Sequence, residues 1–205
     1  MKNRLLAFAT GGMIASVAVL SLTTVSDASA PAEGRVVADA YTVDGVHSSV
    51  TFRVKHQNVA YFYGRFNKVS GSFNLDEANV SASKLDVTID VDSVDTANEG
   101  RDKHLRTADF FSVKEFPTAT FKSTSVESKG EKQYLVKGDL TIRGVTKQVE
   151  ATVVDTGRGA GRGGSKVAGF ETMFKFNRAD YGITYGKDSL GDEITLYVSL
   201  EGGMK

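Results

Sequence analysis

The sequence contains no cysteine and no tryptophan, and it has only two prolines and three histidines among its 205 residues. Without cysteine, the chain has no disulfide bond and no lipid-modified cysteine that could tether it to a membrane. Its 25 basic residues balance its 25 acidic residues. This balance gives no electrostatic reason to expect binding to nucleic acid or to an acidic membrane surface.

The motifs of common active sites are also missing. There is no H-E-x-x-H pattern, and no serine lies in a G-x-S-x-G turn. His47 and His56 are nine positions apart, so a regular strand would direct them to opposite faces. The sequence therefore predicts no catalytic residue, no metal site and no resident cofactor, and we do not expect an enzyme.

No long apolar run is present near the N-terminus. Lys2 and Arg4 precede an apolar stretch whose uninterrupted part, Met13 to Leu22, is shorter than the roughly 20 residues of a membrane-spanning helix. Ala28-Ser29-Ala30 then fits the A-x-A pattern of a cleavage site. We predict that residues 1–30 are a signal peptide and that residues 31–205 form one exported domain. The cleaved domain would lack a stable membrane anchor and reside in the periplasm or outside the cell.

Alternation of apolar and polar residues dominates the rest of the chain. It is clearest in Ser48 to His56, in Lys84 to Val94 and in Glu193 to Glu201, where side chains would project to one apolar and one polar face. The 21 glycines suit a protein of strands and tight turns. Eight or nine such strands predict a small antiparallel barrel or a sandwich.

Two segments interrupt the alternation. Thr96 to Glu99 is compatible with a capping box, which predicts one short helix over Asn98 to Ala108. Asp155 to Ser165 is predicted to be a glycine-rich loop. Its G-x-G-x-x-G string lies between two strands without a following helix, so it does not indicate a dinucleotide site.

Several motifs in fixed order resemble a known family. They are D-G-V-H-S-S-V-T-F-R-V-K-H near residue 50, R-D-K-H-L-R-T-A-D-F-F and F-P-T-A-T-F in the middle, and N-R-A-D-Y-G before the last strand. Together they resemble the YceI-like family over about Ala40 to Gly202. The resemblance implies an all-β fold, a closed antiparallel eight-stranded lipocalin-like barrel with one short helix. The G-x-W signature of true lipocalins is absent, since the chain lacks tryptophan.

The resemblance also implies a function, the binding of a long-chain isoprenoid or similar lipid, including quinone-like lipids, inside the barrel. Phenylalanine and aliphatic residues on the inward parity, with no charged residue among them, agree with an apolar lining. The predicted lipid-binding residues are Val50, Phe52, Val54, Phe73, Leu85, Val87, Ile89, Phe121, Phe170 and Phe174. The residues predicted at the mouth, near the lipid headgroup, are His56, Arg65, Arg101 and His104.

Alternatives of other classes remain open at this point. One is an enzyme or redox accessory that acts on a quinone-like lipid. Another is a structural or stress-related interaction protein whose barrel is filled with side chains, because an eight-stranded barrel is just wide enough either to be filled or to hold one ligand. The sequence leaves both a monomer and a homodimer open, and it does not identify the lipid.

Overall fold

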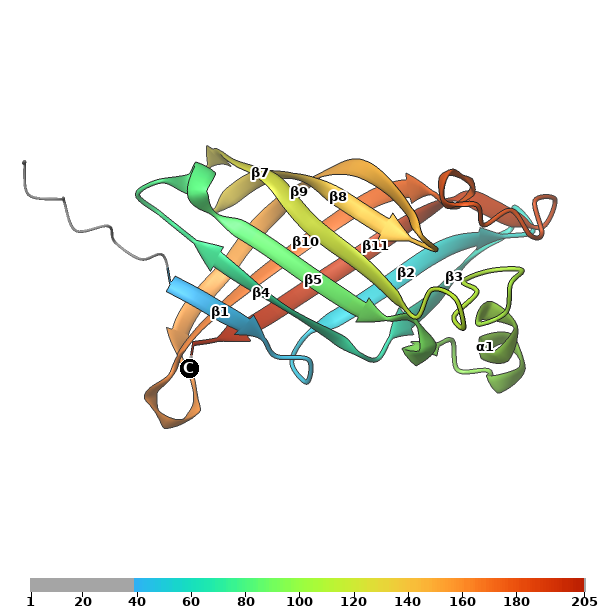
Figure 1. Cartoon of the computed structure of the whole chain (residues 1–205), viewed down its shortest axis with the longest axis horizontal. Helices are drawn as coiled ribbons and strands as arrows, with labels where there is room; N and C mark the ends of the chain where they lie inside the picture. The colour runs from blue at the N-terminus through green and yellow to red at the C-terminus, as the bar shows by residue number, and fades with distance from the viewer. Residues whose placement is uncertain (1–38, 205) are drawn as a thin grey trace, which may run out of the picture. The chain divides into compact units, whose positions relative to one another are not determined.

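Antiparallel β-strands make up most of residues 39–204, the part of the chain that the computed structural model describes (Figure 1). The predicted signal peptide, residues 1–30, lies outside the described residues, as do residues 31–38 and 205. The strands are β1 (Asp39–Val43), β2 (Ser49–His56), β3 (Ala60–Phe66), β4 (Val69–Leu75), β5 (Lys84–Asp90), β6 (Val94–Asp95), β7 (Thr118–Gly130), β8 (Gln133–Ile142), β9 (Val145–Ala160), β10 (Lys166–Asn177) and β11 (Leu190–Gly203). The helix is α1 (Glu99–Leu105), and the 3-10 turns are η1 (Val80–Ala82), η2 (Val91–Ser93), η3 (Arg162–Gly164) and η4 (Arg178–Tyr181).

The sheet closes on itself. Its strand order runs β1-β4-β5-β7-β8-β9-β10-β11, and β11 pairs back with β1, where Thr42 lies opposite Gly203 and Val43 opposite Gly202. These eight strands form a closed antiparallel barrel, which confirms the predicted fold class. Closure leaves no free edge along the ring. None of the helices in residues 39–204 has the length and apolar composition needed to cross a membrane.

The first and last alternating segments of the sequence lie side by side. β2 pairs with β11, with Val50 opposite Val198, Phe52 opposite Leu196 and Val54 opposite Ile194. β11 therefore has two partners on one side, β2 along Leu190–Ser199 and β1 at its end. Beyond β2 the sheet continues with β3 and β6.

The alternation of apolar and polar residues determines which side chains point into the barrel. On β5, Leu85, Val87 and Ile89 project inward, as the sequence predicts, and Val87 is almost fully buried. The predicted strand ends earlier than Val94, because the Asp90 side chain accepts a hydrogen bond from the Asp92 amide at 3.0 Å and starts the turn η2. Val91 still packs inside, with 3 % of its surface exposed.

The helix is present, but its predicted cap is wrong. α1 spans Glu99–Leu105, shorter than the predicted segment, and its N-cap is Asn98, whose side chain accepts from the Arg101 amide at 2.9 Å. Thr96 is buried instead, and its amide and hydroxyl both donate to the Asp102 carboxylate. Asn98 directly precedes the first helical residue, so its side chain, and not that of Thr96, accepts the hydrogen bond of the N-cap.

The glycine-rich segment is mostly strand. β9 continues to Ala160 and pairs with β10 through Gly157, Arg158 and Gly159, so the predicted loop is confined to the residues around η3. A register shift between Gly169 and Phe170 on β10 accommodates this long hairpin. Glycine backbones can form the hydrogen bonds between strands as other residues do. The glycine-rich composition therefore predicted a longer loop than the structure contains.

The two ends of the barrel differ. Figure 1 shows α1 and the connection between β10 and β11 at one end, and the β9–β10 hairpin with the start of β1 at the other. We call them the helix end and the hairpin end. The helix end is covered by chain, and the hairpin end is formed by tight turns between long strands.

Candidate functional site

Two neighbouring cavities occupy the barrel interior, with volumes of about 80 and 140 Å³. Ile89, Leu140 and Leu196 line both of them and form a waist between the two. The middle cavity of 80 Å³ is surrounded by strand residues such as Val50, Val136, Ala151 and Val198. The cavity of 140 Å³ lies toward the helix end, since its lining includes Leu105, Phe110, Phe111, Ile183 and Leu190.

A third, smaller cavity of about 40 Å³ continues the series toward the hairpin end. It includes Tyr134 and Ser83, and it shares Leu85, Val136 and Phe170 with the middle cavity. The three cavities thus follow one another through the barrel and have mainly apolar linings. We call the series the apolar tube.

All ten residues predicted to bind lipid line this tube. Val50, Leu85, Val87, Ile89, Phe121, Phe170 and Phe174 line the middle cavity, Phe52 and Val54 line the larger one, and Phe73 lines the smallest. Their contact with a lipid stays a prediction. Their convergence follows from strand parity, because each was chosen from the apolar side of an alternating segment.

Glycines make room for several of these aromatic rings. A Cβ on Gly138 would lie 2.7 Å from Cε2 of Phe121, and one on Gly64 would lie 2.8 Å from Cε1 of Phe52. Such separations are far below van der Waals contact, so each ring uses the space that a side chain would otherwise fill.

Two of the four predicted mouth residues lie beside the larger cavity without lining it. The Arg101 guanidinium stacks on the Phe62 ring at 4.1 Å, and Phe62 lines the cavity. Arg101 also donates to the hydroxyl and carbonyl oxygens of Thr96, at 2.8 and 2.7 Å. The His104 ring packs edge-on against Phe110, another lining residue, at 5.0 Å between centroids.

The other two predicted mouth residues are exposed on strands. His56 ends β2 opposite Ala60. Arg65 donates to the Asn67 side chain at 2.5 Å, while Phe66 beside it faces the tube. Neither His56 nor Arg65 lines a cavity of the tube, and a headgroup role for any of the four stays a prediction.

Charged residues do line the tube, contrary to the expectation of an uncharged interior: Lys84 and Glu171, which are exposed, and Arg178, which is buried. Arg178 is 5 % exposed and belongs to the wall of the larger cavity. Its guanidinium donates four hydrogen bonds to backbone carbonyls, those of Ile183, Tyr185, Leu190 and Gly191, at 2.7–3.1 Å. Burial lowers the pKa of this guanidinium, and Asp192 opposes the effect. The cation holds the loop that covers the helix end.

Tyr181, three residues further on, is buried with 1 % exposure, and its hydroxyl has no hydrogen-bond partner among residues 39–204. Its ring packs edge-on against Phe176 at 5.3 Å. Burial raises the pKa of the Tyr181 hydroxyl to about 12, so the group is neutral at ordinary pH. Its ring packs beneath the loop, whereas burying its hydroxyl without a hydrogen-bond partner destabilises the folded state.

Comparison with known proteins identifies the family. Residues 41–202 match the YceI-like domain. The chain is also 43% identical over 171 residues to Protein YceI of Salmonella newport strain SL254, covering 82% of this chain and 89% of that protein. The chain belongs to the YceI-like family.

Solved structures support the YceI-like fold. Burkholderia cenocepacia BcnA superposes with a TM-score of 0.71 at 27% identity, covering 78% of this chain and 98% of BcnA. A polyisoprenoid binding domain from Saccharophagus degradans, implicated in plant cell wall breakdown, gives a TM-score of 0.65 at 17% identity. That match covers 82% of this chain and 99% of the domain, and at this identity it shows the shared fold alone.

Two of the motifs that carried the YceI-like resemblance meet at the helix end. R-D-K-H-L-R forms α1, and N-R-A-D-Y-G ends β10 and forms η4. The His104 ring contacts Tyr185, just beyond η4, at 5.0 Å between centroids. These motifs build the closed end of the tube.

Sequence reasoning missed several tube residues at this end, above all Leu105, Phe110, Phe111, Ile183 and Leu190. Most of them lie on the helix and on irregular connections, where period two gives no parity, and Leu190 begins β11 before the predicted strand Glu193 to Glu201. The doublet Phe110-Phe111 within a polar segment was the available signal, because two adjacent large apolar residues outside a strand usually mark burial.

Proposed function

We propose that this protein binds a long-chain isoprenoid or similar amphiphilic lipid inside its barrel. The observation that carries the proposal is the apolar tube, in which three cavities follow one another along the barrel. The Saccharophagus degradans domain with the same fold is described as a polyisoprenoid binding domain, which agrees with such a guest. Binding without chemical conversion of the lipid is the activity that we propose.

Affinity would come mainly from the tail. Each methylene group removed from water contributes about 0.8 kcal/mol, so a tail of many carbons outweighs the free-energy cost of ordering it. Selectivity would come from the length of the tube and from the waist at Ile89, Leu140 and Leu196. A rigid or branched polar molecule would leave its polar groups unpaired against this lining.

The alternative of a filled barrel predicts a solid centre. The interior instead contains cavities of about 80 and 140 Å³. An open interior supports a guest over a purely structural role.

We further propose that the protein acts after export, as a carrier, store or sequestering agent for its lipid in the periplasm. An exported protein that shields a water-insoluble chain would allow that chain to cross an aqueous space. The predicted signal peptide supports this location, and without cysteine the domain would have no lipid-modified cysteine to tether it.

Titration of lipid-stripped protein with a prenyl quinone tests the binding proposal directly. We expect saturable binding of one lipid per chain and no comparable binding of the same quinone ring without its tail. Absence of saturable binding by well-folded protein, or equal binding of the tailless ring, would contradict the proposal.

A further inference from the structure

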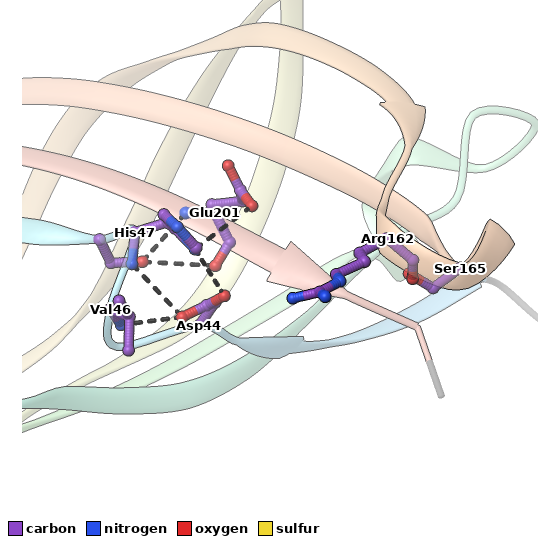
Figure 2. Close-up of polar contacts among 7 residues, drawn as sticks. Asp44, Val46, His47, Arg162, Ser165 and Glu201 are labelled. Carbon is purple, nitrogen blue, oxygen red and sulfur yellow. Dashed lines mark hydrogen bonds and ion pairs between the residues drawn. The ribbon is translucent and has the colours of Figure 1, made fainter.

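A polar cluster lies on the outside of the barrel, where β11 changes partner from β2 to β1. Asp44 and His47 belong to the β1–β2 connection, and Glu201 belongs to β11 (Figure 2). The backbone holds the two segments together, because the Asp44 amide donates to the Glu201 carbonyl at 2.8 Å. The Ser48 hydroxyl also accepts from the Glu201 amide at 3.0 Å.

The side chains of the cluster are arranged around one point. Asp44 Oδ1 accepts from the amides of Val46 and His47, at 2.8 and 3.3 Å, which fixes the carboxylate. Its second oxygen, Oδ2, lies 2.9 Å from His47 Nδ1, and Glu201 Oε1 lies 4.0 Å from the same nitrogen. The three ligand-type atoms all lie within 4.8 Å of one another.

We propose that Asp44, His47 and Glu201 bind a divalent transition-metal cation of the zinc type. One imidazole nitrogen and two carboxylate oxygens are ligands that zinc accepts at about 2.0–2.2 Å, and water completes such a set. Ligands around a tetrahedral zinc ion are then roughly 3.3 Å apart. The Asp44–His47 contact of 2.9 Å is shorter than that value and the His47–Glu201 separation of 4.0 Å is longer, so binding would require a small opening of the first and a movement of the half-buried Glu201 side chain.

The charge of the cluster also favours a cation. With His47 neutral, two carboxylates face one imidazole. The described residues give these carboxylates no ion pair other than those with His47. In Figure 2 the Arg162 side chain extends from the β9–β10 hairpin in the direction of the cluster, but it forms no ion pair with either carboxylate. A divalent ion would offset the two negative charges and link the β1–β2 connection to β11.

Protons compete with the metal for the same nitrogen. The hydrogen bond to Asp44 raises the pKa of His47 above its ordinary value of 6.5, and metal binding requires the neutral ring. Binding of a divalent cation therefore displaces any proton from His47 Nδ1.

Calorimetric titration of zinc into untagged, chelator-treated full chain tests the proposal, with Glu201→Gln and His47→Gln as the disrupting variants. The matched control is Glu193→Gln, because Glu193 is an exposed carboxylate on the same strand that pairs with Lys175 at 2.9 Å. We expect one zinc ion per chain, at least a tenfold loss of affinity in each disrupting variant, and no change in the control.

A second readout separates ligation from loss of fold. Zinc should shift the ring resonances of His47 in the intact protein and leave those of His56 and His104 in place. The absence of saturable zinc binding would overturn the proposal, as would zinc binding that persists unchanged in both Glu201→Gln and His47→Gln.

Discussion

The Phe121 ring lies over Gly138 of the neighbouring strand, in the space that a side chain on Gly138 would occupy. Phe52 has the same relationship with Gly64 of the neighbouring strand, and the Phe73 ring on β4 occupies the space beside Gly202 on β11, with β1 between these two strands. In each pair the ring occupies space that is free because the glycine has no Cβ. The barrel thus lines its interior with phenylalanine beside cavities of about 80 and 140 Å³.

Replacing Gly138 with alanine should push the Phe121 ring into the lumen. The new Cβ would clash with the ring and also with the Lys122 backbone, and overpacking of this kind costs about 1–3 kcal/mol. We expect a lower free energy of unfolding in urea and weaker lipid binding. Gly159→Ala is the control, because a Cβ there meets nothing within 4 Å. Equal behaviour of the two variants would show that the ring does not need the glycine.

Ala151→Phe should shorten the lipid chain that the tube accepts. Ala151 is buried in the wall of the middle cavity, so a ring there fills the path between the two ends. We expect affinity for the longest prenyl chains to fall at least tenfold and affinity for short ones to change little. The control is Ala160→Phe, exposed at the end of the same strand. A loss that is uniform across chain lengths would contradict the threading of a tail through the tube.

Arg178→Lys should loosen the cover of the helix end. An ammonium group cannot donate to four carbonyls in the fork geometry of a guanidinium, so buried acceptors lose their partners. We expect a loss of roughly 2–4 kcal/mol in the free energy of unfolding and faster hydrogen exchange in residues 183–191. Arg65→Lys, on an exposed side chain, should change stability by less than about 0.5 kcal/mol. Unchanged exchange in the Arg178 variant would show that other contacts hold the loop.

Tyr181→Phe should leave the protein equally stable or make it more stable by up to about 1 kcal/mol, because the buried hydroxyl makes no hydrogen bond. The pH dependence gives a second readout. The pKa of Tyr181 in the folded protein is about 12, above the ordinary 10.0. The unfolded chain therefore loses this proton at lower pH than the folded protein does, so the free energy of unfolding is unaffected below pH 10 and falls as the pH rises toward 12. Removing the hydroxyl should flatten the decline in stability over that range. A loss of more than about 1 kcal/mol at neutral pH would show that the hydroxyl has a partner.

Strand parity could be predicted from the sequence because it is a local property. The alternation of Leu85, Val87 and Ile89 requires only a regular strand and one wet face, and these side chains do line the tube. The closed barrel itself followed from the family resemblance. Periodicity alone left a sandwich open, since both architectures use the same alternating strands.

The polar arrangement at the helix end could not be predicted in the same way. The sequence places Arg178 in the motif N-R-A-D-Y-G without indicating its partners, which are four carbonyls of the β10–β11 connection and of the start of β11. Which carbonyls converge depends on the path of that loop. The cluster of Asp44, His47 and Glu201 joins positions more than 150 residues apart in the sequence, and only barrel closure brings them together.

The central claim is that the tube holds a lipid tail. Solvent extraction of the protein purified from its native host, followed by mass spectrometry of the extract, tests it most directly. The account predicts a long-chain isoprenoid lipid at close to one molecule per chain, with less of it recovered from Gly138→Ala. Recovery of folded protein with no bound lipid and no affinity for added prenyl lipids would contradict it.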